Sequence, residues 1–359
     1  MKNLGIVGGG LLGRLATFVL VNAGYNVNVY EKTSQNPPIG ARRSAGFSSA
    51  GMLSPLSERE SGGEEVFNLG TKSMTLWPII NNLVKKVLGV GLGLKIQGNI
   101  FVSQPQDMAF SDRLFDKLRY KKNLISTNTI KKIEPCLDHN LKCWLVENEG
   151  QIDPLLAMKN LYLASITNHS VGKANWSFNA KVDHIDGATI FVDEKKNEFD
   201  WVFDFRGTGA KELGIRGVRG EIFLLIPPKN FILNHPIRLI HPRVKIYIVP
   251  KINGEVIVGA TEIEVEDYSP VSVRSTLELL NAAQIILPEL NEARIKNSDV
   301  NLRPASEDNL PLYFTVARTS CVNGLFRHGW LLAPALLDSI FTDIGIKTAL
   351  SYQIEKSIK

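Results

Sequence analysis

Apolar and polar positions near the amino terminus follow two different periods. Residues 3–10 form a short apolar run that ends in glycines, and residues 11–24 carry apolar side chains at the length and spacing of a helix that ends at Gly24. Residues 25–31 alternate between polar and apolar side chains and include β-branched valines, which is typical of a strand. The pattern therefore predicts a strand, a helix and a second strand in succession.

The middle of the chain predicts further helices and strands. Residues 64–88 have the pattern of an amphipathic helix with a break before Pro78, and residues 112–123 predict another helix. Residues 94–104 predict a pair of strands. Three β-rich runs separated by turn signals then predict a small antiparallel meander: residues 174–186, 187–194 and 198–207.

The clearest hairpin signal surrounds an asparagine–glycine pair at 253–254, which predicts a two-residue turn. This register places Tyr247 opposite Ala260. It also places Lys245 opposite Glu262. Because side chains alternate with period two along a strand, Tyr247, Ala260 and Glu262 are expected to share one face. A phenol beside a small alanine would leave space for a small ligand, whereas ordinary core packing of the tyrosine is the alternative.

The length and composition are those of a globular protein. A chain of 359 residues exceeds one ordinary core, so two domains, or one domain interrupted by another, are expected. Hydrophobic residues make up 44% and charged residues 21%, values that disfavour a disordered or membrane-spanning chain. No segment reaches the roughly 20 uninterrupted apolar residues of a spanning helix, so no membrane association is predicted. The glycine cluster and Arg14 in the apolar opening argue against a signal peptide, and we expect a cytoplasmic protein.

Charge and cysteine usage argue against two further kinds of site. The net charge of +5 is spread along the chain, and the densest basic runs, 117–123 and 129–134, are short and lack an aromatic platform. We interpret them as solvated faces and expect no nucleic-acid partner. Cys136, Cys143 and Cys321 have neither an even count nor CxxC spacing, which predicts buried thiols in a reducing compartment and no metal site.

Glycines at the junction of the first strand and the first helix indicate a dinucleotide site. In that context Gly8 allows a tight turn, Gly10 lets the backbone approach a pyrophosphate, and Gly13 lets the helix pack closely on the strand. The phosphates would lie at the positive end of the helix. Glu31 ends the second strand, where an acceptor for ribose hydroxyl groups is required, and its charge disfavours a 2′-phosphate. NAD and FAD both satisfy this pattern, and a nucleotide-free turn with a solvated Glu31 is the alternative.

A long segment rich in small and turn-forming residues, 32–55, follows without helical or strand periodicity. Loops of this length are usually functional or disordered. Its core, 47–53, offers small side chains and a glycine, as a backbone does when it lies flat against a rigid ligand. A surface linker is the alternative interpretation.

Several blocks in order along nearly the whole chain resemble the D-amino-acid oxidase and glycine oxidase family of FAD enzymes, in particular the glycine oxidases of thiamine biosynthesis. They are "GIVGGGLLG" with Glu31, "SSAGMLSP", "EGQIDP", "DWVFDFRGTGA", "VRGE", "YIVPKINGEVIVGAT", "LRP" and "FRHGWLLAP". The resemblance implies an α/β fold in which a Rossmann-type FAD-binding domain is interleaved with a substrate domain built on an antiparallel sheet. The FAD-binding domain would comprise residues 1–85, 166–216 and 306–359, and the substrate domain residues 86–165 and 217–305.

The same resemblance implies which residues contact non-covalent FAD. They lie in the glycine motif, at the end of the second strand, in the small-residue loop, at one position of the meander and in the turn before the last helix: Gly8, Gly10, Leu11, Leu12, Gly13, Glu31, Lys32, Ser49, Ala50, Gly51, Met52, Val182, Leu325, Phe326, Arg327, His328, Gly329, Trp330 and Leu331. Backbone N–H groups of that turn and the positive end of the helix would stabilise negative charge on the reduced flavin.

The substrate contacts implied by the resemblance are Tyr247, Arg303 and Arg327. Arg303, in "LRP", would bind the amino acid's carboxylate through the two-pronged geometry that a guanidinium supplies. From local sequence alone, Arg327 has the features of a surface arginine that flanks a helix. His328 is expected to be a spectator in the chemistry, because hydride transfer from the α-carbon needs no essential side-chain base once the amine is neutral.

The implied activity is oxidation of a small amino acid, glycine in the first place, by FAD and molecular oxygen to an imine that hydrolyses to glyoxylate and ammonia, with release of hydrogen peroxide. The resemblance also implies a role in thiamine supply and a homotetramer. The alternatives are an oxidase or dehydrogenase of another small amine such as sarcosine, proline or a D-amino acid, a flavoprotein that has lost catalysis, and an NAD-dependent dehydrogenase.

Two features depart from the family pattern. Glu262 occupies a position that is often apolar, where a carboxylate would repel the substrate's carboxylate or pair with Lys245. Residues 305–315 replace a compact turn, although Asn309 can adopt the left-handed conformation of glycine.

Overall fold

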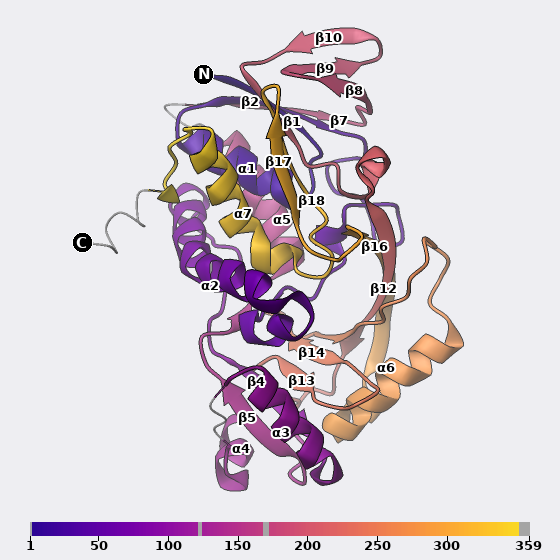
Figure 1. The fold of residues 1–359 in the computed structure, drawn as a ribbon. Helices are drawn as coiled ribbons and strands as arrows, with labels where there is room; N and C mark the ends of the chain where they lie inside the picture. The colour runs from indigo at the N-terminus through magenta and orange to yellow at the C-terminus, as the bar shows by residue number, and fades with distance from the viewer. Residues whose placement is uncertain (1, 121–123, 168–171, 352–359) are drawn as a thin grey trace, which may run out of the picture.

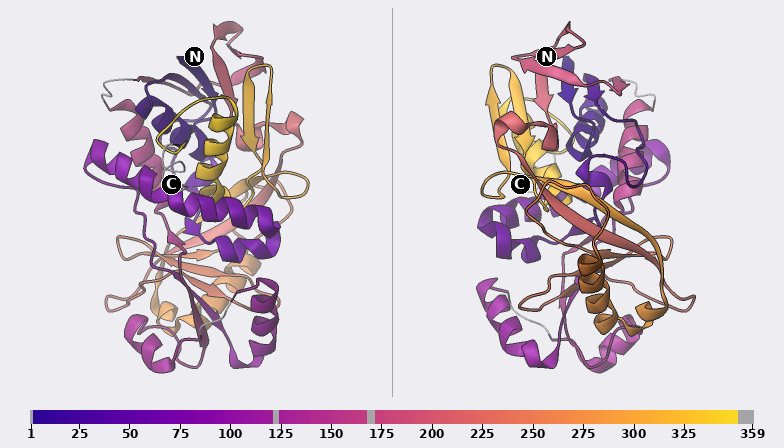
Figure 2. Two further views of the ribbon diagram at one scale, coloured as in Figure 1. Left: turned by 60° about the vertical axis from the view of Figure 1, so that its left-hand side comes forward. Right: turned by 90° about the vertical axis from the view of Figure 1, so that its right-hand side faces the viewer.

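The computed structural model describes residues 2–120, 124–167 and 172–351, which form two sheets stacked one above the other with helices around them (Figure 1). Both views of Figure 2 show the same division into an upper and a lower region, with helix α2 (Pro55–Leu88) crossing the molecule where they meet. No helix in the described part of the chain has the length and apolar character needed to cross a bilayer.

The upper sheet has six strands and is built around the predicted strand–helix–strand unit. Its order is β17 (Leu312–Val316), β18 (Thr319–Asn323), β11 (Trp201–Asp204), β1 (Asn3–Val7), β2 (Asn26–Glu31) and β7 (Ala174–Phe178). All neighbours are parallel except β17, which runs antiparallel to β18 at the edge. The mainly parallel sheet agrees with the Rossmann-type architecture that was expected.

The two faces of β1 pack against different layers. Leu4 and Ile6 belong to the largest apolar cluster, which contains residues of α1 (Leu11–Asn22), α5 (Pro154–Ile166), α7 (Gly329–Asp343) and α2. Val7 points the other way and packs with Ile190 of a small antiparallel sheet, β8 (Val182–Asp186), β9 (Thr189–Val192) and β10 (Lys195–Glu198). Because side chains alternate along a strand, this single buried strand joins two layers.

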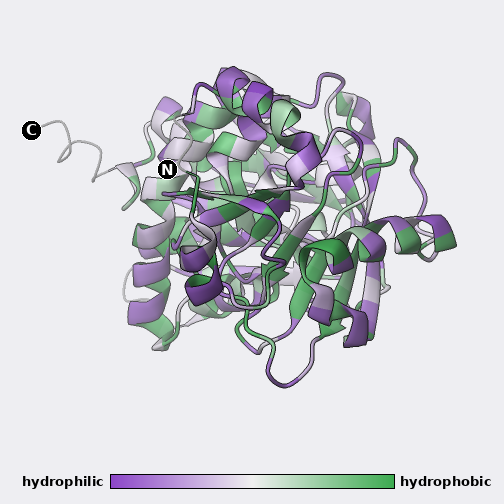
Figure 3. Ribbon diagram, turned by 90° about the horizontal axis from the view of Figure 1, so that it is seen from below, coloured by the Kyte–Doolittle hydropathy of each residue, from purple (hydrophilic) through white to green (hydrophobic). Residues whose placement is uncertain are grey.

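The lower sheet has seven strands and forms the floor of the molecule. Its order is β16 (Arg294–Ala305), β12 (Arg216–Ile226), β15 (Val256–Gly259), β14 (Tyr247–Pro250), β13 (Ile237–Leu239), β4 (Asn99–Ser103) and β5 (Lys142–Val146). Helices α3 (Met108–Lys117), α4 (Thr127–Ile133) and α6 (Val273–Ile286) pack around it. Seen from below, the strands are mainly apolar whereas these outer helices carry polar segments (Figure 3). The long strands β12 and β16 extend from this sheet up to the first one (Figure 1).

The remaining elements are short. A two-stranded ribbon pairs β3 (Met52–Leu53) with β6 (Gly150–Gln151). Single 3₁₀ turns lie at Ala45–Phe47, Pro105–Asp107, Gly207–Gly209, Lys211–Leu213 and Pro288–Glu292. The strands of the upper sheet all come from the segments expected for the FAD-binding domain, whereas α5 begins before residue 166 and packs against α1. How the chain divides into domains stays a prediction.

The expected break in the long helix is in a different place. Pro78 lies inside α2, and the non-helical residue is Gly63, with φ 65° and ψ −158°. Proline removes one hydrogen bond, but Trp77 and Ile80 on either side of it are completely buried against the core, so packing holds the helix together there. Glycine adopts positive φ without a steric penalty, which puts the kink at Gly63.

Three other predictions of secondary structure need correction. The expected strand pair at 94–104 is one strand, β4, because its partners β5 and β13 come from elsewhere in the chain. The meander is formed by β8, β9 and β10 only, since β7 and β11 leave it to pair with β2 and β1 of the upper sheet. The helix expected at 112–123 is α3, which begins and ends earlier, and residues 121–123 lie outside the described part of the chain.

Candidate active site

A cavity of about 780 Å³ extends from the glycine motif of the upper sheet to the strands of the lower sheet. It has the size of a typical ligand pocket. Nearly all of the residues expected to contact FAD or substrate line it: Gly8, Gly10, Leu11, Leu12, Glu31, Lys32, Ser49, Ala50, Gly51, Met52, Tyr247, Arg303, Leu325, Phe326, Arg327, His328, Gly329, Trp330 and Leu331. Two do not. Gly13 is packed inside the motif. Val182 contributes instead to the apolar cluster between the upper sheet and the small antiparallel sheet of β8, β9 and β10, next to the lining residue Lys181.

The glycine motif makes a cradle that side chains would fill. Gly8 has φ +103°, and a Cβ on it would lie 2.4 Å from the carbonyl oxygen of Phe205. A Cβ on Gly13 would lie 1.9 Å from the carbonyl oxygen of Gly8, so Gly13 lets α1 pack against the turn. No side chain caps the N-terminus of α1, where Gly10 is the N-cap residue. Backbone N–H groups at the positive end of this helix therefore face the cavity, as a pyrophosphate requires.

Glu31 is held at the end of β2 by hydrogen bonds that do not use all the acceptor positions of its carboxylate. Its Oε2 accepts a hydrogen bond from the backbone N–H of Gly9 at 2.7 Å, and its Oε1 accepts from the N–H and the hydroxyl of Thr33, both at 2.8 Å. A carboxylate has about four acceptor positions, so these three contacts leave one for a ribose hydroxyl group. The cradle and Glu31 together fit the nucleotide half of FAD.

Arg14 is a buried positioning residue that the sequence did not reveal as such. Its guanidinium donates to the carbonyl oxygens of Gly9 at 3.0 Å and Met158 at 2.7 Å and lies 5.0 Å from the ring centroid of Phe47. Burial lowers the pKa of Arg14 to about 10. Arg14 therefore links the glycine motif to α5 and to the small-residue loop. In the sequence, only the length of its side chain is consistent with such a role.

The turn before α7 brings the end of the chain to the lower sheet. Phe326 has φ 47°, and its N–H donates to the carbonyl oxygen of Pro304 at 2.7 Å. The turn ends at His328, the N-cap residue of α7, so the first N–H groups of that helix have no acceptor within the helix. These groups face the cavity and can stabilise negative charge at the flavin end of the cofactor.

Arg303 is held in the cavity wall by carbonyl oxygens rather than by acids. Its two terminal nitrogens donate to the carbonyl oxygens of Arg219 at 3.2 Å and Thr261 at 2.9 Å. A Cβ on Gly220 would lie 2.5 Å from the guanidinium, which explains the glycine there. Among the described residues, no carboxylate forms an ion pair with Arg303, whose pKa is lowered by burial. A buried cation without a countercharge is a strong site for an anionic ligand.

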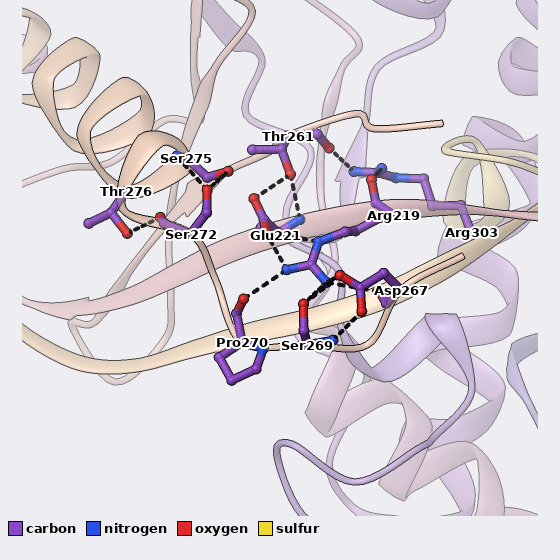
Figure 4. A network of polar contacts seen from close by, with 10 residues as sticks. All are labelled: Arg219, Glu221, Thr261, Asp267, Ser269, Pro270, Ser272, Ser275, Thr276 and Arg303. Carbon is purple, nitrogen blue, oxygen red and sulfur yellow. Dashed lines mark hydrogen bonds and ion pairs between the residues drawn. The ribbon is translucent and has the colours of Figure 1, made fainter. Parts of the chain in front are cut away.

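A buried polar network below Arg303 fixes those carbonyl groups (Figure 4). Arg219 donates to Glu221 Oε1 from Nε at 3.0 Å and from a terminal nitrogen at 2.6 Å. Glu221 Oε2 in turn accepts from the hydroxyl of Thr261 at 3.0 Å, and that hydroxyl accepts from the N–H of Glu221 at the same distance. Because every member has a partner, the network holds the acceptors of Arg303 rigidly.

Tyr247 reaches the cavity in a different register from the one expected. It pairs with Gly259, not with Ala260, and Pro250 pairs with Val256. The N–H of Lys251 also donates to the carbonyl oxygen of Glu255 at 2.8 Å. The hairpin loop therefore contains three residues, 252–254, and Gly254 closes it with φ +82°. A Cβ on Gly259 would lie 2.8 Å from the phenol oxygen, so the space beside the phenol is provided by a glycine. Tyr247, Ala260 and Glu262 nevertheless all line the cavity.

Arg327 is bound by two acidic side chains, one of which was not predicted from the sequence. Glu58 Oε2 lies 2.8 Å from its Nε, and a terminal nitrogen donates to Glu58 Oε1 at 3.1 Å. Its other terminal nitrogen donates to Glu262 Oε2 at 3.2 Å. The expected pair of Glu262 with Lys245 is wrong, because Lys245 pairs with Glu60.

Glu58 also contacts Arg238 at 3.2 Å and lies 3.0 Å from Nδ1 of His328. Burial alone would raise the pKa of Glu58, but Arg327 and then His328 and Arg238 hold it well below its usual range. Glu58 and Arg238 line the cavity and were not predicted. Acidic residues are common in the first turn of a helix because they stabilise the helix dipole, so the position of Glu58 gave no distinctive signal. Arg238 lies on a short strand without a motif and gave none either.

The divergent segment after "LRP" lies away from this site. Asn309 has φ 63°, which confirms the expected left-handed conformation, and none of residues 307–315 lines the cavity. Tyr313 and Phe314 lie exposed on the edge strand β17. The bulk of these side chains therefore has no direct effect on the cavity.

Comparisons with known proteins agree with this geometry. A family model described as FAD dependent oxidoreductase (DAO) matches residues 3–336. A protein of Rhizobium etli named as a thiamine biosynthesis oxidoreductase, ThiO, is 33% identical over 344 residues, 93% of this chain and 93% of the relative. Glycine oxidase of Geobacillus kaustophilus is 25% identical over 361 residues, 92% of this chain and 90% of the relative.

The crystal structure of glycine oxidase from Bacillus cereus has the same fold, with a TM-score of 0.82 at 21% identity over 98% of this chain and 99% of that chain. The match of the family model covers both large sheets and every residue that lines the cavity. The chain therefore belongs to the DAO family of FAD-dependent oxidoreductases and is an enzyme of the glycine oxidase type.

Proposed function

We propose that this enzyme oxidatively deaminates glycine or a similarly small amino acid, and that its product serves the thiazole branch of thiamine biosynthesis. The observation that carries the proposal is the guanidinium of Arg303, a buried cation with no acidic partner among the described residues, in the same cavity as Tyr247 and the nucleotide cradle. The relationship to ThiO and to glycine oxidases supports the substrate class and the pathway.

The residues of the chain bind and orient the substrate. The carboxylate of the amino acid is bound by Arg303 and by the hydroxyl of Tyr247, whose pKa burial raises so that the phenol remains a proton donor. This fixes the α-carbon against the flavin side of the cavity. Bound FAD supplies the chemistry, since it accepts a hydride from the α-carbon, after which the imine hydrolyses to glyoxylate and ammonia and oxygen takes up the electrons as hydrogen peroxide.

No side chain of the site is needed as a general base. Glu58 is held as a carboxylate by Arg327, so its role is to balance charge beside the cavity. The substrate reacts with a neutral amine, and its proton is lost to solvent before the carbon–hydrogen bond breaks. The helix N-terminus at His328 then complements the charge that develops at the flavin end.

An anaerobic substrate panel tests the proposal. The purified holoenzyme is mixed with glycine, sarcosine, D-alanine or D-proline, and the flavin absorbance near its visible maximum is recorded before air is admitted. Glycine is expected to bleach the flavin, with hydrogen peroxide and glyoxylate formed in equal amounts in air. Bleaching by another amine alone, or reoxidation only by an added carrier, identifies the corresponding oxidase or dehydrogenase instead. A flavin that no compound bleaches overturns the proposal.

The family resemblance also supports a homotetramer. Light scattering coupled to size-exclusion chromatography measures the mass directly, against 39.8 kDa for one chain.

A further inference from the structure

Arg327 has little capacity left for a ligand. Three of its nitrogens face carboxylates of the protein: Nε and one terminal nitrogen face Glu58, and the other terminal nitrogen faces Glu262. The side chain is only 22% exposed. Burial would lower its pKa, but Glu58 and Glu262 raise it above the usual value, so Arg327 is a fully charged member of an internal ion-pair cluster.

The cluster is balanced in charge. Its two carboxylates, Glu58 and Glu262, offset two guanidinium groups, Arg327 and Arg238. Arg303 lies outside it and forms no ion pair with a carboxylate among the described residues, although Glu262 and Glu58 act on its charge from a distance. Both arginines line one cavity, and of the two only Arg303 is without an acidic partner among the described residues.

We propose that Glu262 is a specificity residue that restricts the site to amino acids with a single carboxylate. This inference rests on the proposed function in taking an amino acid as the substrate. A second carboxylate on the substrate would compete with Glu262 for Arg327, and it would meet that carboxylate in a partly desolvated cavity, where like charges repel. Glu262 therefore excludes the N-carboxymethyl class of amino acids, of which iminodiacetate is the smallest member.

Glu262, rather than Glu58, is the residue that can have this role. The side chain of Glu262 is 46% exposed, and among the described residues its ion pair in the cluster is with Arg327. Glu58 is 13% exposed and contacts Arg327, Arg238 and His328. Removal of Glu58 would leave buried cations unpaired and disturb the fold, whereas removal of Glu262 leaves the two-point pair of Arg327 with Glu58 intact.

The substitution Glu262→Gln gives the cluster a net positive charge and replaces the ion pair at one terminal nitrogen of Arg327 by, at most, a neutral hydrogen bond. A substrate or inhibitor with two carboxylates is then bound at both ends, one by Arg303 and the other by Arg327. The gain is limited because the site is partly exposed, and we expect about tenfold.

Two ligands that cannot be oxidised test the inference apart from turnover. Methoxyacetate and diglycolate have one and two carboxylates and are the oxygen analogues of sarcosine and iminodiacetate. Their dissociation constants are measured by titration calorimetry and by perturbation of the flavin spectrum in the oxidised holoenzyme. Wild type should bind methoxyacetate more tightly than diglycolate, and Glu262→Gln should raise the relative affinity for diglycolate by about tenfold. The ratio of kcat/KM for iminodiacetate and sarcosine should move in the same direction.

The matched control is Glu264→Gln, which removes an equal charge from a carboxylate that pairs with Arg216 and does not line the cavity. It should leave the ratio of the two dissociation constants unchanged. An unchanged ratio in Glu262→Gln, an equal change in Glu264→Gln, or failure of both ligands to bind any of the proteins overturns the inference. Binding that follows the expected pattern without oxidation of any amine would overturn only the proposed function.

Discussion

Glu58 and Arg327, which are 269 residues apart in the chain, form a two-point ion pair at the wall of the cavity. The pair joins the first turn of α2 to the turn before α7, and it engages two nitrogens of one of the two arginines that were expected to contact the substrate. In the proposed mechanism the substrate carboxylate therefore binds Arg303 and the hydroxyl of Tyr247 rather than Arg327. Four predictions test this arrangement and its surroundings.

Arg303→Lys should raise KM for the amino acid by at least about a hundredfold, because an ammonium cannot make the two parallel hydrogen bonds of a guanidinium. Steady-state kinetics and the dissociation constant for methoxyacetate measure the effect. Arg216→Lys is the control, since Arg216 pairs with Glu264 at the surface of the same sheet. Similar KM values for the Arg303→Lys variant and wild type would show that the carboxylate is bound elsewhere.

Gly259→Ala should displace the phenol of Tyr247, because the new Cβ would lie 2.8 Å from its oxygen. We expect KM to rise by about tenfold and the free energy of unfolding to fall by about 1–3 kcal/mol. Gly254→Ala is a matched control at the hairpin loop, where a Cβ meets nothing within 4 Å although φ is +82°. It should lose some stability but keep the wild-type KM, and a raised KM there would argue against a local effect at Tyr247.

Thr261→Val should loosen Arg303 without touching the substrate. The change removes the hydroxyl between the N–H and the carboxylate of Glu221, and the loss should cost about 1–3 kcal/mol of stability. Because Arg303 is held by the carbonyl oxygen of Thr261, KM should rise more than kcat falls. Thr261→Ser keeps the hydroxyl and should restore KM, so equal kinetics of the two variants would refute the positioning role.

Glu149 should make stability depend on pH. Burial raises its pKa from 4.5 to about 7, and its carboxyl accepts hydrogen bonds from the N–H of Leu56 and from Asn99, each at 2.9 Å. The folded state therefore binds the proton more tightly than the unfolded state does. The contribution of this protonation to the stability of the fold is fully present below pH 4.5 and is lost as the pH rises through about 7.

The free energy of unfolding of wild type, measured with urea, should fall by about 3 kcal/mol between pH 4.5 and pH 7 because of Glu149. Glu149→Gln should lose that part of the pH dependence, and Glu147→Gln, an exposed neighbour, should keep it. Identical profiles for wild type and Glu149→Gln would contradict the prediction.

Local pattern was sufficient for some features of the site. The strand–helix–strand unit, the cradle of Gly8 and Gly13, and the position of Glu31 could be predicted because each depends on residues close together in the chain. The resemblance of several sequence blocks to one family then indicated that Arg303 and Arg327 line one cavity, which the structure shows.

The hairpin at Tyr247 shows where periodicity fails. An asparagine–glycine pair suits a two-residue turn, but the same glycine also closes a three-residue loop, and the alternation of side chains is compatible with both. Pairing with the neighbouring strand decided between them, since Gly259 also pairs with Ile222 of β12. A shift of one residue placed a glycine beside the phenol of Tyr247.

By itself the sequence determined the elements whose hydrogen bonds and apolar faces are local, together with the chemical kinds of residue available to the site. The tertiary structure alone decided which polar groups meet: Glu58 with Arg327, Glu262 with Arg327 rather than Lys245, and Arg303, within the described part of the chain, with carbonyl oxygens. Ion pairs depend on distances between side chains that are far apart in the chain, and a sequence pattern contains no such distances.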